Sequence, residues 1–114
     1  AATGISLITD AQVGAGRKIY PIGFNLVNTG ATAWTDATAT LVAIEDTAGT
    51  DAWSIAKAAI TASVNIGPAT ASVTNAAAVI GFSGLGAGKG LQLKADKSFA
   101  NGTDLAFVVW GIIK

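Results

Sequence analysis

The chain has 114 residues, seven basic and seven acidic, with a formal net charge of zero and no cysteine or histidine. That length fits one domain, and the composition excludes disulfides, thiolate chemistry and a triad that needs a histidine base. Nucleic acid and membranes are not expected as partners, because the chain has no basic stripe and no run of about 18 apolar residues.

Residues 1–16 are predicted to form an N-terminal arm, and residues 17–114 a single domain. The arm is bounded by glycine and mostly uncharged, with room for one short strand near Gly4–Thr9. Its large apolar side chains, Ile5, Leu7 and Ile8, form a candidate anchor on a larger particle. The alternative is a flexible tail with one edge strand.

Alternation of apolar and polar residues predicts the first long strand over Lys18–Asn28. Pro21 lies in this run and lacks an N–H donor, which indicates an edge position or a bulge. Every second side chain is expected on the apolar face, with the tyrosine buried: Tyr20, Ile22, Phe24 and Leu26.

Trp34 follows the turn sequence NTGAT and has two interpretations. An exposed indole would stack on a sugar or anchor a partner protein, whereas a buried one would close the end of a sandwich. The next strand is predicted over Ala37–Ile44, followed by the turn EDTAGTD. Asp46 and Asp51 flank that turn, but their spacing departs from a calcium loop, so solvated turn acids are expected there.

Residues 51–66 fit two structures. One is a pair of strands, Ala52–Lys57 and Ile60–Ile66, which the β-branched residues favour. The other is a helix that begins at Thr50 or Asp51 and ends at Gly67.

The glycine-rich stretch GFSGLGAGKG, residues 81–90, lacks the spacing of a phosphate-binding loop. We therefore predict a turn between two strands, Ala78–Phe82 and a run in which Leu91, Leu93 and Ala95 alternate with polar residues. No cofactor and no metal ion are expected.

Asn101-Gly102 is a strong hairpin signal before the last strand. That strand is apolar on both faces, so both need cover. Leu105, Phe107, Val109 and Ile113 form one face. The other is a candidate subunit interface: Ala106, Val108, Trp110 and Ile112. Its cover is either another part of this chain or a second subunit in a homo-oligomer, with a trimer favoured for a jelly roll.

About eight strands separated by turn residues predict an all-β fold, an antiparallel β-sandwich or jelly roll. With no histidine and seven carboxylates, the chain is not expected to be an enzyme. Low charge without disulfides further suggests a protein made in a host cytoplasm and displayed outside on a particle.

Two stretches resemble small β-sandwich modules of tailed-bacteriophage virion proteins. They are GRKIYPIGFNLVNTGATAWTDATATLVAIEDTAGTDAW (16–53) and VIGFSGLGAGKGLQLKADKSFANGTDLAFVVWGI (79–112). The sequence departs from that pattern in having Gly84-Leu85-Gly86 in place of a Pro-Leu-Arg-Gly loop. The resemblance implies a virion-surface structural protein, a decoration or cement module bound to a major capsid protein or another virion protein. A receptor- or glycan-binding head of a fibre or adhesin is the alternative.

Overall fold

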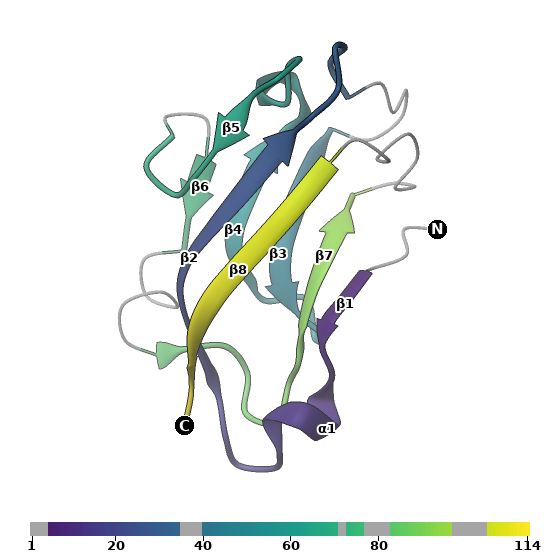
Figure 1. The fold of residues 1–114 in the computed structure, drawn as a ribbon. Helices are drawn as coiled ribbons and strands as arrows, with labels where there is room; N and C mark the ends of the chain where they lie inside the picture. The colour runs from purple at the N-terminus through teal and green to yellow at the C-terminus, as the bar shows by residue number, and fades with distance from the viewer. Residues whose placement is uncertain (1–4, 35–39, 71–72, 77–82, 97–104) are drawn as a thin grey trace.

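The computed structural model describes residues 5–34, 40–70, 73–76, 83–96 and 105–114. Within them the chain forms two antiparallel sheets packed face to face, as a β-sandwich requires (Figure 1). The larger sheet has the order β1-β7-β3-β4-β6 and the smaller β5-β2-β8. The predicted all-β sandwich is confirmed, and no helix of the described residues is long and apolar enough to cross a membrane.

The larger sheet contains five strands: β1 (Ile5–Ile8), β3 (Leu41–Asp46), β4 (Asp51–Ala56), β6 (Val73–Asn75) and β7 (Leu91–Ala95). The smaller sheet contains β2 (Ile19–Asn28), β5 (Asn65–Ile66) and β8 (Leu105–Ile113). A single helical turn, α1 (Asp10–Val13), follows β1, and a 3-10 turn (Lys57–Ala59) follows β4.

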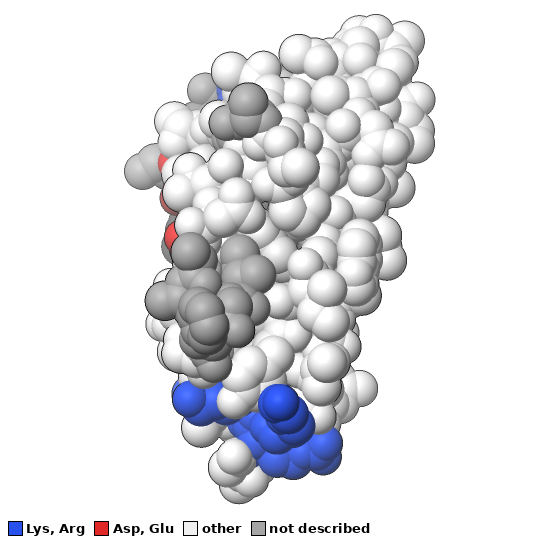
Figure 2. Space-filling view, turned by 90° about the vertical axis from the view of Figure 1, so that its left-hand side faces the viewer, with Lys and Arg blue, Asp and Glu red and all other residues white. Residues whose placement is uncertain are grey.

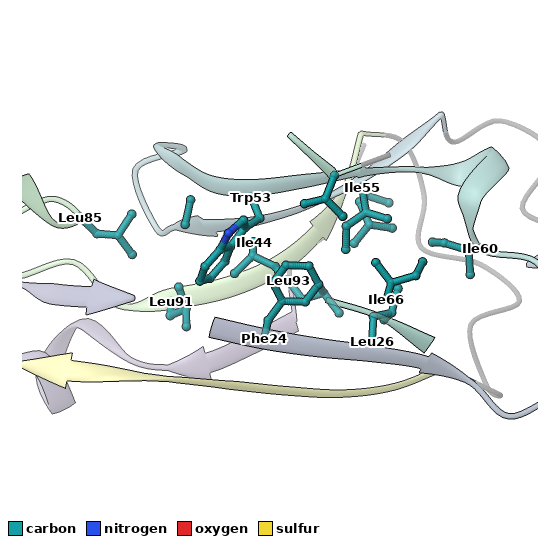
Figure 3. Packing of buried hydrophobic residues seen from close by; sticks show 14 of the residues in the cluster. Phe24, Leu26, Ile44, Trp53, Ile55, Ile60, Ile66, Leu85, Leu91 and Leu93 are labelled. Atoms are coloured by element: carbon teal, nitrogen blue, oxygen red, sulfur yellow. The ribbon is translucent and has the colours of Figure 1, made fainter. Parts of the chain in front are cut away.

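The core lies between the sheets, where apolar side chains from both inner faces interdigitate (Figure 3). Phe24 of β2 is at its centre. Its ring centroid lies 5.0 Å from that of Trp53 on β4 and 6.0 Å from that of Phe107 on β8. The Phe24–Trp53 contact joins the two sheets, and the Phe24–Phe107 contact joins two strands of the smaller sheet.

The arm residues that the structure describes fold onto the sandwich. β1 pairs antiparallel with β7, which provides the predicted edge strand. Thr9 begins α1 with a capping box, in which its hydroxyl accepts from the Gln12 N–H and the Gln12 side chain accepts from the Thr9 N–H. Val13 is fully buried, so this segment adds to the core.

Residues 51–66 contain one of the two predicted strands and no α-helix. β4 forms as expected, but the second strand is reduced to β5, because the chain turns at 57–64 with Ser63 at a positive φ of 55°. Ile60 and Ile66 are both fully buried. Their side chains face the core from a turn and a two-residue strand, so the alternation reflects burial and not a continuous strand.

The last two strands do not form a hairpin with each other. β8 pairs with β2 along its length, whereas β7 pairs with β1 and β3 in the other sheet. The prediction that a hairpin at Asn101-Gly102 pairs the strands on either side of it is therefore wrong, because β7 and β8 belong to different sheets. Those two residues lie outside the described part of the chain, as do the predicted strand 78–82 and the start of the predicted strand 37–44.

Candidate docking surface

The outer face of the smaller sheet carries large apolar side chains exposed to solvent. Val108, Trp110 and Ile112 of β8 are 54%, 49% and 50% exposed, and Ile22 of β2 is 55% exposed. With the exposed Ala106 they form one surface, called here the apolar face: Ile22, Ala106, Val108, Trp110 and Ile112. The four predicted interface residues of β8 therefore share one side, and no described part of the chain covers them as the alternative required.

A bulge in β2 brings Ile22 to the apolar face. Pro21 lies opposite Gly111 and Gly23 opposite Trp110, which leaves Ile22 as the extra residue between them. The register shift inverts the predicted alternation: Ile22 points outward and Tyr20 is half-buried. The prediction of one buried face from Tyr20 to Leu26 is wrong for these two residues, whereas the bulge at Pro21 is confirmed.

Gly23 fits beneath the indole of Trp110. A Cβ atom at this position would lie 2.4 Å from Cζ2 of the Trp110 ring, well inside the contact distance. Because glycine has no Cβ atom, the Trp110 ring can approach the β2 backbone at this position. The shape of the apolar face depends on this close approach.

No charged residue occurs in the three strands of the smaller sheet, as their sequences show. Basic residues gather at one end of the sheet, where the backbones of Lys18 and Lys114 exchange two hydrogen bonds of 3.0 Å. Arg17 donates from Nη2 to the Ile113 carbonyl oxygen at 3.3 Å. Figure 2 shows Lys and Arg gathered at the lower end of the molecule, with little charge on the described surface above.

The carboxylates of the described residues lie outside the smaller sheet, and several of them accept hydrogen bonds from the chain's own backbone and side chains. Asp46 is fully buried and accepts three backbone N–H groups at 2.9 Å, from Ala48, Thr50 and Gly86. Asp10 accepts from the Thr47 hydroxyl and the Gly90 N–H, both at 2.6 Å, and these bonds lower the pKa of its carboxyl group. The two aspartates tie the β3–β4 turn and α1 to the glycine-rich loop.

The described part of the glycine-rich loop, residues 83–90, is a structural turn, as predicted. Gly84 and Gly88 have φ of +66° and +69°, which only glycine adopts without strain. The N–H of Leu85 donates to Ile19 and that of Gly88 to Arg17, at 2.9 and 2.7 Å. Because two further loop amides bind Asp46 and Asp10, the donors that would cradle a phosphate already have partners.

Burial raises the pKa of Glu45, and the neighbouring Asp51 adds to this shift. Gln92 works against it by donating from Nε2 to Oε1 at 2.9 Å. No group of three or more acidic side chains is arranged to hold a metal ion in the described residues. The acids of the β3–β4 turn thus bond within the protein, although buried Asp46 is not the solvated acid that the sequence predicts.

Trp34 is only 4% exposed and belongs to the core cluster. The interpretation that it is an exposed contact for a sugar or partner is therefore wrong. The tryptophan follows a turn, but its backbone N–H donates to the Ile60 carbonyl oxygen at 3.0 Å, which fixes it against the chain between β4 and β5. Its burial agrees with the alternative, in which it closes the sandwich.

The candidate anchor residues of β1 differ in exposure. Ile5 is 48% exposed, whereas Leu7 and Ile8 are half-buried and pack against the core. Only Ile5 offers a large apolar surface to a partner. Sequence reasoning did not find Ile22 as part of the apolar face, although Pro21 and Gly23 on either side were the signal for the bulge that exposes it.

Comparisons with protein-family models, with curated proteins and with solved structures find no match to this chain.

Proposed function

We propose that this chain is a non-enzymatic structural protein of a virion, a decoration or cement module that binds a capsid surface as a homo-oligomer. The observation that carries the proposal is the apolar face. Monomeric proteins rarely leave large apolar side chains together on one exposed surface unless a partner covers them. The virion setting comes from the sequence resemblance to phage modules.

The composition of the smaller sheet supports assembly through this face. An exposed sheet surface normally carries charged or polar side chains, which keep the protein soluble and monomeric. Here Val108 and Trp110 stand at the centre with no charge in any of the three strands. Aromatic and branched apolar residues of this kind dominate the buried centre of protein interfaces, with charged residues at the rim, as Lys18 and Lys114 are here.

The fold supports a role in which the module is passive. Sites of chemistry need ionisable groups poised in a cavity, and the buried carboxylates Glu45 and Asp46 are bonded to their own chain. With Trp34 buried, the alternative of a glycan-binding head has lost the residue on which it rested.

The test is a charge placed on the apolar face. Val108→Asp should convert the oligomer to a monomer in sedimentation equilibrium at about 1–100 μM, because assembly would bury an unpaired carboxylate. Thr74→Asp, at an exposed position of β6 in the other sheet, is the matched control and should leave the oligomer intact. Native particles should then bind the wild-type protein and the control but not Val108→Asp.

Two results contradict the proposal. A wild-type chain that stays monomeric at 100 μM would remove the assembly role. An oligomer that binds no virion would remove the capsid role alone.

A further inference from the structure

β8 is an edge strand with an open hydrogen-bonding side. Lys18 and Lys114 exchange both backbone bonds, so the N–H and C=O of Lys114 point toward β2. Since backbone groups alternate sides along an antiparallel strand, those of Phe107, Val109 and Gly111 point away from β2. In the described residues β8 pairs only with β2, so these groups form an unpaired ladder.

The larger sheet extends past this open edge. Figure 1 shows β7 and β1 beyond the free side of β8, with no strand of the smaller sheet in front of β1. Ile5 of β1 lies directly opposite Leu93 of β7, so both side chains point to the inner side of the sheet. Leu93 is buried, but Ile5 is 48% exposed. At this side the smaller sheet is therefore one strand too narrow to cover the inner face of the larger sheet.

An apolar cavity of about 230 Å³ opens between the two sheets at the same side. Residues from four strands line it, among them the apolar side chains of Ile8, Leu91 and Ile113, together with Trp110 and Gly111 of β8. A cavity of about 150 Å³ with such a lining holds a benzene ring. The space is therefore sufficient for an apolar side chain that enters from the edge of β8.

A cation stands at one end of the open edge. Arg17 donates to the carbonyl oxygen of Ile113, which by the same alternation faces away from β2. Lys18 and Lys114 lie beside it. A segment that ran antiparallel to β8 would bring its amino end to these three positive charges.

We propose that the open edge of β8 binds an extended peptide segment of another protein. The segment adds as a fourth strand antiparallel to β8, with apolar side chains at alternate positions and an acidic residue at its amino end. Its backbone pairs with Phe107, Val109 and Gly111, and its inward side chains fill the cavity and cover Ile5. This mode of recognition, in which the backbone gives affinity and pockets give selectivity, is β-augmentation.

A second copy of the whole sandwich does not fit this edge. If its β8 paired here, its own β7 and β1 would enter the space already taken by β7 and β1 of the first copy (Figure 1). A single strand avoids this collision. The backbone groups of the site belong to residues of β8 that alternate with those of the apolar face, and Trp110 borders both surfaces. The inference does not depend on the proposed virion role.

The probe is a library of eight-residue peptides. Each has aspartate at the amino end, threonine at alternate positions, and Ala, Val, Ile, Leu or Phe at the others. We expect calorimetry to find members with dissociation constants below about 1 mM. In the best binder, N-methylation of residues that face β8 should weaken binding about tenfold or more, whereas N-methylation of the alternate residues should not. Amide exchange at Val109 and Gly111 should slow on binding.

A separate experiment tests the role of the positive charges. Arg17→Glu should weaken an aspartate-ended peptide about fivefold and strengthen its lysine-ended counterpart, while Thr74→Asp should change neither. A library with no binder below 1 mM, equal effects of the two N-methylation patterns, or exchange protection confined to Val108 and Trp110 would each overturn the proposal.

Discussion

Asp46 is predicted to be the side chain on which the β3–β4 turn and the glycine-rich loop both depend. Its buried carboxylate accepts N–H groups from Ala48 and Thr50 at Oδ1 and from Gly86 at Oδ2, all at 2.9 Å. Asp46→Ala removes all three acceptors at once. Because the loop and the turn are joined here, we expect the change to destabilise the whole sandwich.

The magnitude follows from the three bonds. A hydrogen bond to a charged group contributes about 1.5–3 kcal/mol. Ala48 and Thr50 are exposed, so in the variant water can bind their N–H groups in place of the carboxylate. The Gly86 N–H points at the position of the removed oxygen and loses its acceptor. Asp46→Ala should therefore lower the free energy of unfolding by about 3–4 kcal/mol. In a domain of this size that corresponds to roughly 10–15 °C in melting temperature.

Asp46→Asn separates the two halves of this effect. Its carbonyl oxygen can still accept from Ala48 and Thr50, but its NH₂ group would face the Gly86 N–H, donor against donor. We expect a loss of about 1–2 kcal/mol. Asp51→Ala is the control, since it removes an exposed aspartate at the other end of the same turn and should not destabilise.

Urea denaturation followed by circular dichroism and tryptophan fluorescence measures all three variants. The reasoning is refuted if Asp46→Ala costs under 1 kcal/mol, or if the asparagine and alanine variants lose the same amount. Either result would mean that water satisfies the three amides as well as the carboxylate does.

Three further predictions concern charge and packing. Glu45→Gln should raise stability at pH 7 by about 0.5–1 kcal/mol. The pKa of Glu45 is raised by burial and then by Asp51, so its unfavourable contribution appears as the pH rises through that pKa. The gain should vanish at pH 3, and urea midpoints at both pH values check this. Hydrogen bonds from the Thr40 hydroxyl and backbone N–H lower the pKa of Asp96 to about 2. Ionised Asp96 should therefore stabilise the fold above about pH 4, and this contribution should be lost as the pH falls to 2. In an acid titration of stability, the Asp96→Asn variant should not show this loss. Gly23→Ala should displace the Trp110 ring, which a Cβ would meet at 2.4 Å, and weaken assembly in sedimentation more than it lowers the melting temperature. Gly67→Ala, whose Cβ meets nothing closer than 3.7 Å, should leave both unchanged.

The sequence was sufficient for the fold class because alternation, turn residues and β-branched residues agree along most of the chain. The inward and outward side chains of β7 and β8 are the ones predicted. Apolar and inward positions alternate without interruption in both strands, and both strands pack against the same core. The β2 strand shows where such reasoning ends. One extra residue in a bulge inverts the faces on its amino-terminal side, and the proline that marks a bulge does not specify which residue becomes the extra one.

The pairing of strands that are distant in the chain could not be predicted from the sequence either. Asn101-Gly102 is a strong local hairpin signal, but β8 joined β2 in the other sheet because its inner side chains Phe107 and Val109 complete the core around Phe24. Trp34 is a similar case. Its neighbours are turn residues, so local composition indicates exposure, whereas contact with the chain near Ile60 buries it.

The two sheets divide the properties of the molecule between them. Buried carboxylates of the larger sheet, Glu45 and Asp46, hold its turns and loops together through bonds within the chain. The smaller sheet has no charged residue in its strands. Among the described residues, the outward side chains of its last strand lack cover, and the outer backbone groups of that strand lack partners. A monomer gains nothing from either feature, because exposed apolar residues and open strand edges both promote association. Both liabilities lie on β8, with residues of even number serving the face and residues of odd number serving the edge. We therefore propose that this one strand engages two different partners, with Trp110 bordering both surfaces.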